Sequence, residues 1–274
     1  MTDAPASATK AETGKRDSGM SWHIVRHAFQ MVFGNLAEAL KVSVGPVLIL
    51  VAIYFGMLQI LGLPMNFYVV LESRPEMAGA ALLAVLVMVV AYLVVFSWVA
   101  VAWHRFVLLE EYPGALPAFG GRPVLPYLGK TLLVALILML IMIPLFMLVG
   151  LALGPMMAAS PLIGGLLVGL MLGVVFSFFW LRFAVCLPAT AVGKPMKIGE
   201  SWATTAPLSG IIFGVTVIIT ALNLVASVIA GQLATLSAVL GTVVDLGITW
   251  VTMMVGVSIL TTLYGHLVEG RELA

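Results

Sequence analysis

Long apolar segments separated by short polar stretches make up most of this chain. A helix needs about 20 apolar residues to cross the hydrocarbon core of a membrane. Residues 208–266 form one nearly continuous apolar run, too long for one span, so we place a turn near residues 231–237. The pattern predicts an all-α polytopic membrane protein with six transmembrane helices, at residues 44–63, 77–103, 127–153, 161–187, 208–234 and 235–266.

The residues before the first span divide into two parts. Residues 21–43 place Trp22, Phe29 and Leu36 on one helical face and His23 and Glu38 on another, which predicts an amphipathic helix in the membrane interface. The alternative is that they are the first turns of a longer, tilted span. Residues 1–20 contain no aromatic residue, so we expect a disordered tail before a single membrane domain at 21–274.

Composition supports the membrane assignment. The chain is 62% hydrophobic and 9% charged, whereas soluble domains average about 25% charged residues. The apolar excess must therefore face lipid. A net charge of +1 argues against a nucleic-acid partner, which would require a basic face. The single cysteine, Cys186, excludes an intramolecular disulfide and zinc motifs built on cysteine pairs.

Basic residues indicate the orientation. With these six spans, Arg74 is the only one of the 13 lysines and arginines that falls on the opposite side from the termini. Because positive charge accumulates on the cytoplasmic side, both termini are expected to be cytoplasmic.

A short pattern recurs where spans end on that side. Trp103 and Arg105, followed by Phe106, end the second span, and Trp180 and Arg182, followed by Phe183, end the fourth. The recurrence favours three helical hairpins in series. The simpler interpretation is that tryptophan and arginine anchor many span ends.

The segment after the fourth span carries a resemblance. It combines the aromatic–Arg–Phe exit with Pro188–Ala189 and with Ser201, Trp202 and Thr204 before the fifth span. This arrangement is similar to a group of bacterial six-span proteins that includes YciC-type inner-membrane proteins and the membrane domain of some glycerophosphodiester phosphodiesterases. The resemblance implies six helices in a bacterial inner membrane. The soluble phosphodiesterase barrel is absent, so that activity is not implied.

Asp245 is the one acidic residue predicted deep within a span. An aspartate at the centre of a span costs about 2.5–3.5 kcal/mol, so it should face protein or water. A hairpin folded about residue 234 places Asn223 opposite Asp245 and Thr220 near Thr249. We hypothesise that Asn223 donates a hydrogen bond to Asp245. The pair would then form a proton- or cation-binding site, or else only fix the register of two packed helices.

Small residues recur every four positions in the fourth span, which predicts close helix packing with an internal partner or, less favoured, a second copy of the chain. These are Gly165, Gly169, Gly173 and Ser177.

Aromatic and basic residues near the predicted cytoplasmic ends are candidates for anchoring or for contacts with lipid head groups. They are Trp103, Arg105, Trp180, Arg182, Lys194 and Lys197. The four histidines map to the same side and are expected to be solvated or in contact with lipid head groups, so neither a metal nor a cofactor is predicted.

No catalytic or nucleotide-binding motif is present in the sequence, so we expect no enzyme. The first functional hypothesis is a non-catalytic membrane protein that organises lipids or partner proteins in the cell envelope. The second is a small transporter or channel that uses Asp245 and Asn223. An intramembrane enzyme is weaker than both, because such chemistry usually needs several ionisable residues at one depth.

Overall fold

The computed structural model describes residues 6–65 and 74–272, with side chains from residue 19 onward. Within these residues it is an all-α protein in which six helical segments are long and apolar enough to cross a membrane. Their bounds are Leu36–Leu61, Pro75–Leu109, Val124–Ala159, Pro161–Ala191, Ile198–Leu236 and Ala238–Leu267. The predicted fold class is confirmed.

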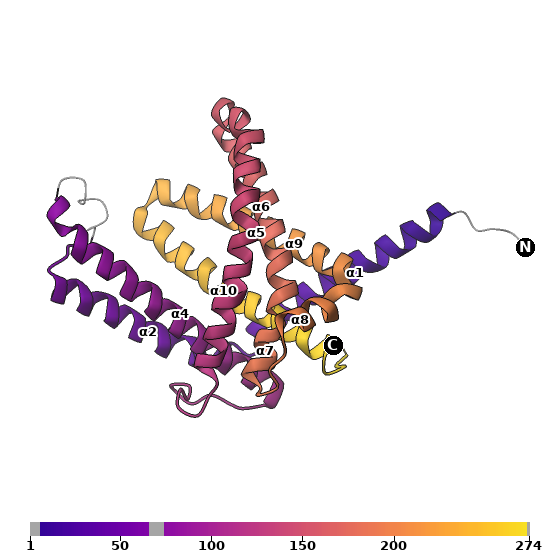
Figure 1. Ribbon diagram of the computed structural model, residues 1–274, viewed down its shortest axis with the longest axis horizontal. Coiled ribbons are helices and arrows are strands. Elements are labelled where there is room, and N and C mark those ends of the chain that lie inside the picture. The colour runs from indigo at the N-terminus through magenta and orange to yellow at the C-terminus, as the bar shows by residue number, and fades with distance from the viewer. Residues whose placement is uncertain (1–5, 66–73, 273–274) are drawn as a thin grey trace, which may run out of the picture.

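The long helices pair as three hairpins (Figure 1). They are α2 (Leu36–Leu61) with α4 (Ala78–Leu109), α5 (Val124–Ala159) with α6 (Pro161–Ala184), and α9 (Ser209–Leu236) with α10 (Ala238–Leu267). Short turns enforce two of these pairings. Ser160 precedes the helix-starting Pro161, and Ser237 alone separates α9 from α10 and accepts a hydrogen bond from the Leu240 amide (3.3 Å).

The hairpins diverge from a compact base (Figure 1). The base contains the ends of α4, α6 and α10, the wholly buried α7 (Cys186–Ala191) and the short α8 (Ile198–Thr205). Its largest fully buried side chains include Trp103, Tyr127 and Tyr264. A second, smaller core of Met57, Leu58, Leu63, Ala81 and Ala84 lies within the α2–α4 hairpin.

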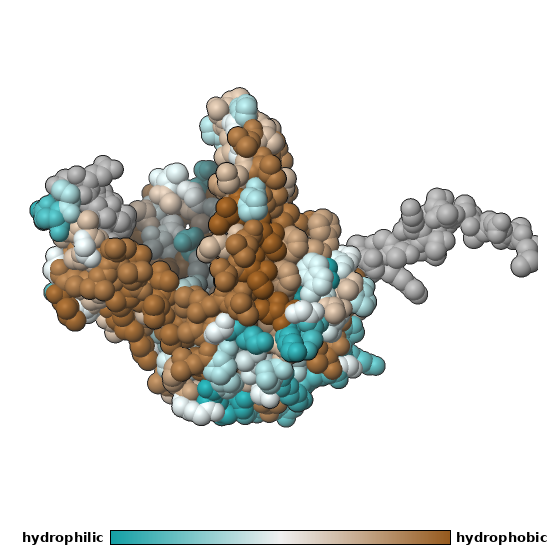
Figure 2. Space-filling view, in the orientation of Figure 1, coloured by the Kyte–Doolittle hydropathy of each residue, from teal (hydrophilic) through white to brown (hydrophobic). Residues whose placement is uncertain are grey.

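Apolar side chains cover the outside of the hairpins. Ile60, Leu151 and Leu236 are 85%, 79% and 79% exposed. Figure 2 shows broad hydrophobic surfaces on the arms and hydrophilic surface on the underside of the base. Exposing this much apolar surface to water is unfavourable, so lipid must cover the arms. The protein is a multi-pass membrane protein.

The N-terminal segment differs from the prediction. Helix α1 (Ala6–Gly34) extends through most of the segment expected to be a disordered tail, and residues 1–5 of that tail lie outside the described residues. Residues 6–16 are rich in Ala, Lys, Glu and Arg, which favour helix. The later residues of α1 pack on the rest of the protein and form the helix there. Residues 6–16 extend this existing helix, so they add no nucleation cost.

The amphipathic segment 21–43 is also not one helix. It breaks at Asn35, whose side-chain Nδ2 donates to the Met31 carbonyl (2.9 Å) and whose backbone leaves the helical region. Residues after the break are the first turns of α2, as the alternative interpretation held. Residues before it pack on α9 and α10, where Ser21 Oγ donates to the Ile211 carbonyl (2.8 Å) and Ile24 and Ala28 are buried.

Candidate functional site

Asp245 is exposed and lines a cavity of about 510 Å³ between the three hairpins. Helices α4, α5, α6, α9 and α10 all contribute to its walls. The hollow between the α2–α4 and α5–α6 arms is visible in Figure 2. Asp245 lies about 12 Å from the α9–α10 turn, and the lining continues along α10 for about 22 Å to Leu260 at the base.

Aromatic side chains form two of the walls. On α4, the rings of Tyr92 and Phe96 stack with centroids 6.3 Å apart, and on α6 those of Phe176 and Trp180 stack at 6.3 Å. Tyr127 of α5 lines the cavity at its base end. Tyr92, Phe96 and Phe176 were not among the candidate residues predicted from the sequence. The four-residue spacing within each stacked pair was an available signal, because residues four apart share a helix face.

The polar groups of the cavity lie on α9 and α10. Asp245, Thr249 and Thr252 line it from α10 and Ser227 from α9. Among the residues that the structure describes, Asp245 is the only charged side chain in the lining, and it has no hydrogen bond or ion pair.

The predicted pairing of Asn223 with Asp245 is wrong. Asn223 Oδ1 instead accepts a hydrogen bond from Thr252 Oγ1 (2.6 Å). The turn is at Ser237 rather than near residue 234, which moves the partner of Asn223 by about two helical turns along α10. Close contact between Gly241 and Ala234 follows the same register.

Thr220 does not join the cavity. It faces α6, where a Cβ added at Gly173 would lie 2.7 Å from Thr220 Cγ2. Gly173 therefore packs against an internal partner, as the favoured interpretation held. Gly165 and Gly169 have open space beside them and Ser177 is half-buried, so the four small residues do not form one continuous contact within the described chain.

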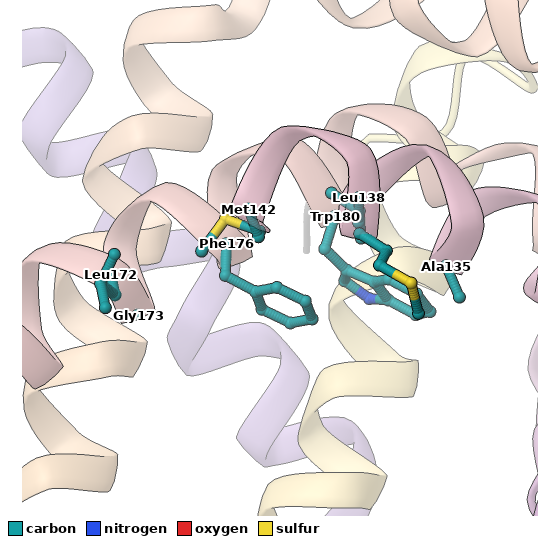
Figure 3. A pocket seen from close by; sticks show the side chains of 8 residues that line it. Ala135, Leu138, Met142, Leu172, Gly173, Phe176 and Trp180 are labelled. Atoms are coloured by element: carbon teal, nitrogen blue, oxygen red, sulfur yellow. The ribbon is translucent and has the colours of Figure 1, made fainter. Parts of the chain in front are cut away.

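A second cavity adjoins the first. It has a volume of about 450 Å³ and is lined by apolar side chains of α5 and α6, with Phe176 and Trp180 shared between the two cavities. Figure 3 shows Leu138 and Met142 of α5 beside Leu172, Phe176 and Trp180 of α6. An apolar groove is thus continuous with a cavity that carries a carboxylate.

Hydrogen-bonded side chains seal the base below the cavity. Trp103 Nε1 donates to Ser258 Oγ (2.9 Å), and the two ring nitrogens of His104 lie 2.8 Å from Thr261 Oγ1 and 3.2 Å from Tyr127 Oη. Both Trp103 and His104 have 0% exposure. Two expectations therefore fail: Trp103 does not reach lipid head groups, and His104 is not solvated. The ends of three spans converge here. A prediction that treats each span separately does not include contacts between spans.

Arg105 is held inside the protein as well. Its Nη1 donates to the Ala191 carbonyl of α7 (2.8 Å), and its Nε donates to Glu111 Oε2 (3.0 Å). Arg122 Nη2 lies 2.9 Å from the same carboxylate oxygen. Hydrogen bonding from Arg105 lowers the pKa of Glu111 below its ordinary value, and the charges of both arginines act in the same direction.

Arg182 repeats this arrangement in the next hairpin. It is 7% exposed, its Nη2 donates to the Trp202 carbonyl of α8 (2.8 Å), and its guanidinium lies 3.5 Å from the Trp202 ring centroid. Each arginine of the recurring pattern therefore fixes one of the two short helices that follow α6: Arg105 binds α7, and Arg182 binds α8. This internal role replaces the predicted lipid contact, because neither guanidinium is directed outward.

The other three anchoring candidates do not take part in these internal contacts of the base. Trp180 lines both cavities, whereas Lys194 and Lys197 are exposed on the base. Lys194 Nζ lies 3.6 Å from Glu269 Oε1. Within residues 6–65 and 74–272, no group of three His, Cys, Asp or Glu side chains could hold a metal ion.

The geometry defines a class of protein: an α-helical multi-pass membrane protein with three hairpins on a common base and a cavity between them. No protein-family model matches the chain, and neither a curated protein nor a solved structure is significantly similar to it.

Proposed function

We propose that this chain is a non-catalytic protein of a bacterial inner membrane that binds lipid between its hairpins and thereby organises lipids or partner proteins of the envelope. The observation that carries the proposal is the cavity of about 510 Å³ together with its apolar extension. Both volumes are in the range of small-molecule sites, which are mostly apolar with few polar groups.

The surroundings of the cavity support a binding role over a catalytic one. Asp245 has no histidine, lysine or second carboxylate beside it in the described lining, so no general acid–base pair is assembled there. The inner-membrane location rests on the resemblance to YciC-type proteins. The orientation with cytoplasmic termini rests on the basic residues of the base, from which Arg74 is separated by the length of the α2–α4 hairpin.

Filling the cavity tests this function. Gly256 lines the cavity and has no atom within 4 Å of an added Cβ, so Gly256→Leu places a side chain in the open space. Gly247 is also on α10 with open space beside it, but it lies outside the lining, so Gly247→Leu is the matched control. Native mass spectrometry of protein released from membranes should show bound lipid in the wild type and the control, and several-fold less in Gly256→Leu. Equal lipid retention in all three would contradict the proposal.

A second candidate function is a small transporter or channel that uses Asp245. The favouring observation is that Asp245 is exposed on a cavity rather than enclosed in a dry helix contact. Transport would also require the sealed base at Trp103, His104 and Tyr127 to open. Solute flux measured in proteoliposomes distinguishes the two functions. Flux that Asp245→Asn abolishes supports transport, whereas lipid binding without flux favours the first function.

A further inference from the structure

We propose that the ligand of the cavity carries a cationic head, either a quaternary ammonium or a protonated amine, which binds between Asp245 and the aromatic walls while its apolar tail occupies the α5–α6 groove. This inference rests on the proposed lipid-binding function and specifies the chemistry of the ligand.

The charge of the cavity favours a cation. Asp245 places a carboxylate in a cavity whose described lining contains no lysine or arginine. The basic residues of the surrounding helices, Arg105, Lys130 and Arg182, lie at the base ends of α4, α5 and α6, and the first and last of these are engaged by internal partners. Because a carboxylate within a membrane is costly without a counter-charge, this site favours a cationic ligand.

The aromatic walls of the cavity also favour a cation. The stacked pairs Tyr92–Phe96 and Phe176–Trp180 flank the cavity from two different hairpins. Aromatic faces attract cations through their quadrupoles, and quaternary ammonium groups are typically bound in aromatic cages. A head that carries only negative charge, such as a sulfate or a phosphate monoester, would meet the carboxylate and the ring faces with the unfavourable sign.

Two hydroxyl groups of the cavity have their protons engaged within the protein. Thr252 Oγ1 donates its proton to Asn223 Oδ1 (2.6 Å), and Ser227 Oγ donates to the Asn223 carbonyl (2.8 Å). Both oxygens therefore retain only lone pairs for a ligand. These two oxygens are hydrogen-bond acceptors, which the N–H groups of a protonated amine can use and an anion cannot; a quaternary ammonium would rely on the carboxylate and the ring faces alone.

The adjoining α5–α6 groove is the proposed binding site for the apolar tail of the ligand. It holds about 450 Å³ between α5 and α6, is apolar throughout its lining, and meets the cavity at Phe176 and Trp180 (Figure 3). A linear alkyl or acyl chain fits this extension. Two sources share the chemistry: a bilayer lipid with an ethanolamine or choline head, and a free alkylammonium amphiphile.

Binding to full-length protein in nanodiscs tests the inference. Decyltrimethylammonium, decyl sulfate and decanol share a chain and differ in head charge, so their affinities isolate the head. We expect the cation to bind at least about tenfold more tightly than decanol, and the sulfate to bind most weakly. In Asp245→Asn the preference for the cation should disappear while decanol still binds. Glu76→Gln removes an exposed carboxylate outside the cavity and should behave as wild type.

The outcomes are distinguishable. Decanol binding without a preference for the cation, or a preference that persists in Asp245→Asn, overturns the cationic head but leaves lipid binding intact. If no amphiphile binds, the proposed function fails with it. Native mass spectrometry from nanodiscs containing phosphatidylethanolamine and phosphatidylglycerol separates the sources. Enriched phosphatidylethanolamine identifies a bilayer lipid, and binding of the alkylammonium alone identifies a free amphiphile.

Discussion

At the scale of single residues, charged side chains of the base act as internal connectors. The Arg182 guanidinium stacks on Trp202 and also donates to the Trp202 carbonyl and to Thr205 Oγ1 (3.2 Å). A planar guanidinium can stack and donate at the same time, which an ammonium cannot. Position 182 therefore requires arginine. The Arg182 side chain holds α8 against α6.

Glu111 gives a prediction at this scale. Its pKa is lowered in the folded protein, so its ionised form stabilises the fold above the ordinary carboxyl pKa, and this contribution disappears as the pH falls through the lowered value. Glu111→Gln should therefore lower the melting temperature at pH 7, and the difference from wild type should vanish in acid. Because the side chain is 33% exposed, the effect is at most about 1 kcal/mol.

Thermal unfolding in detergent between pH 7 and pH 3 measures this effect. The neighbouring Glu110 is exposed and makes no ion pair among the described residues, so Glu110→Gln serves as the control. A constant difference between Glu111→Gln and wild type across this range would contradict the assignment.

At the scale of helices, α6 and α9 approach each other closely at Gly173. A Cβ at position 173 would lie 2.7 Å from Thr220 Cγ2, whereas one at position 169 meets nothing within 4 Å. Gly173→Ala should destabilise the protein by about 1–3 kcal/mol through overpacking. Gly169→Ala should be neutral or stabilising by up to about 1 kcal/mol, because alanine favours helix. Denaturation in mild detergent compares the two, and equal effects would show that the α6–α9 contact is not as described.

The register of α9 on α10 gives a second prediction at this scale. In a double-mutant cycle, Asn223→Leu and Thr252→Val should be coupled by about 0.6 kcal/mol, and by no more than about 1.7 kcal/mol. Asn223→Leu and Asp245→Asn should be additive within about 0.5 kcal/mol. Unfolding free energies measure both cycles. Coupling to Asp245 in place of Thr252 would restore the register predicted from the sequence.

The sequence was sufficient for the long helices because lipid imposes a simple requirement of length and hydropathy. It also identified Asp245 as the acidic residue of a span. The partners of Asn223, Trp103 and His104 were not predictable in this way. Each depends on the register or convergence of helices distant in sequence, and a shift of two turns leaves the apolar pattern of a span unchanged.

At the scale of the whole molecule, the proposed orientation can be tested by labelling. The base carries Lys194 and Gly270, while Arg74 and Ser237 lie at the opposite ends of their hairpins. Single cysteines at positions 74 and 237 should react with a membrane-impermeant maleimide in intact spheroplasts. Those at 194 and 270 should react only after permeabilisation. Native Cys186 is buried, so the wild-type chain gives the unlabelled control. The reverse pattern would invert the orientation.

The docking of α1 has a consequence for biosynthesis. Ser21 binds the carbonyl of Ile211, which is 190 residues later in the chain. At about 5–20 residues per second, the ribosome delivers this partner roughly 10–40 s after Ser21 itself. During that interval the apolar stripe of α1 has no intramolecular surface to cover it, and the membrane interface is the available place for it. The amphipathic pattern thus suits two successive environments: the bilayer surface during translation and the α9–α10 hairpin afterwards.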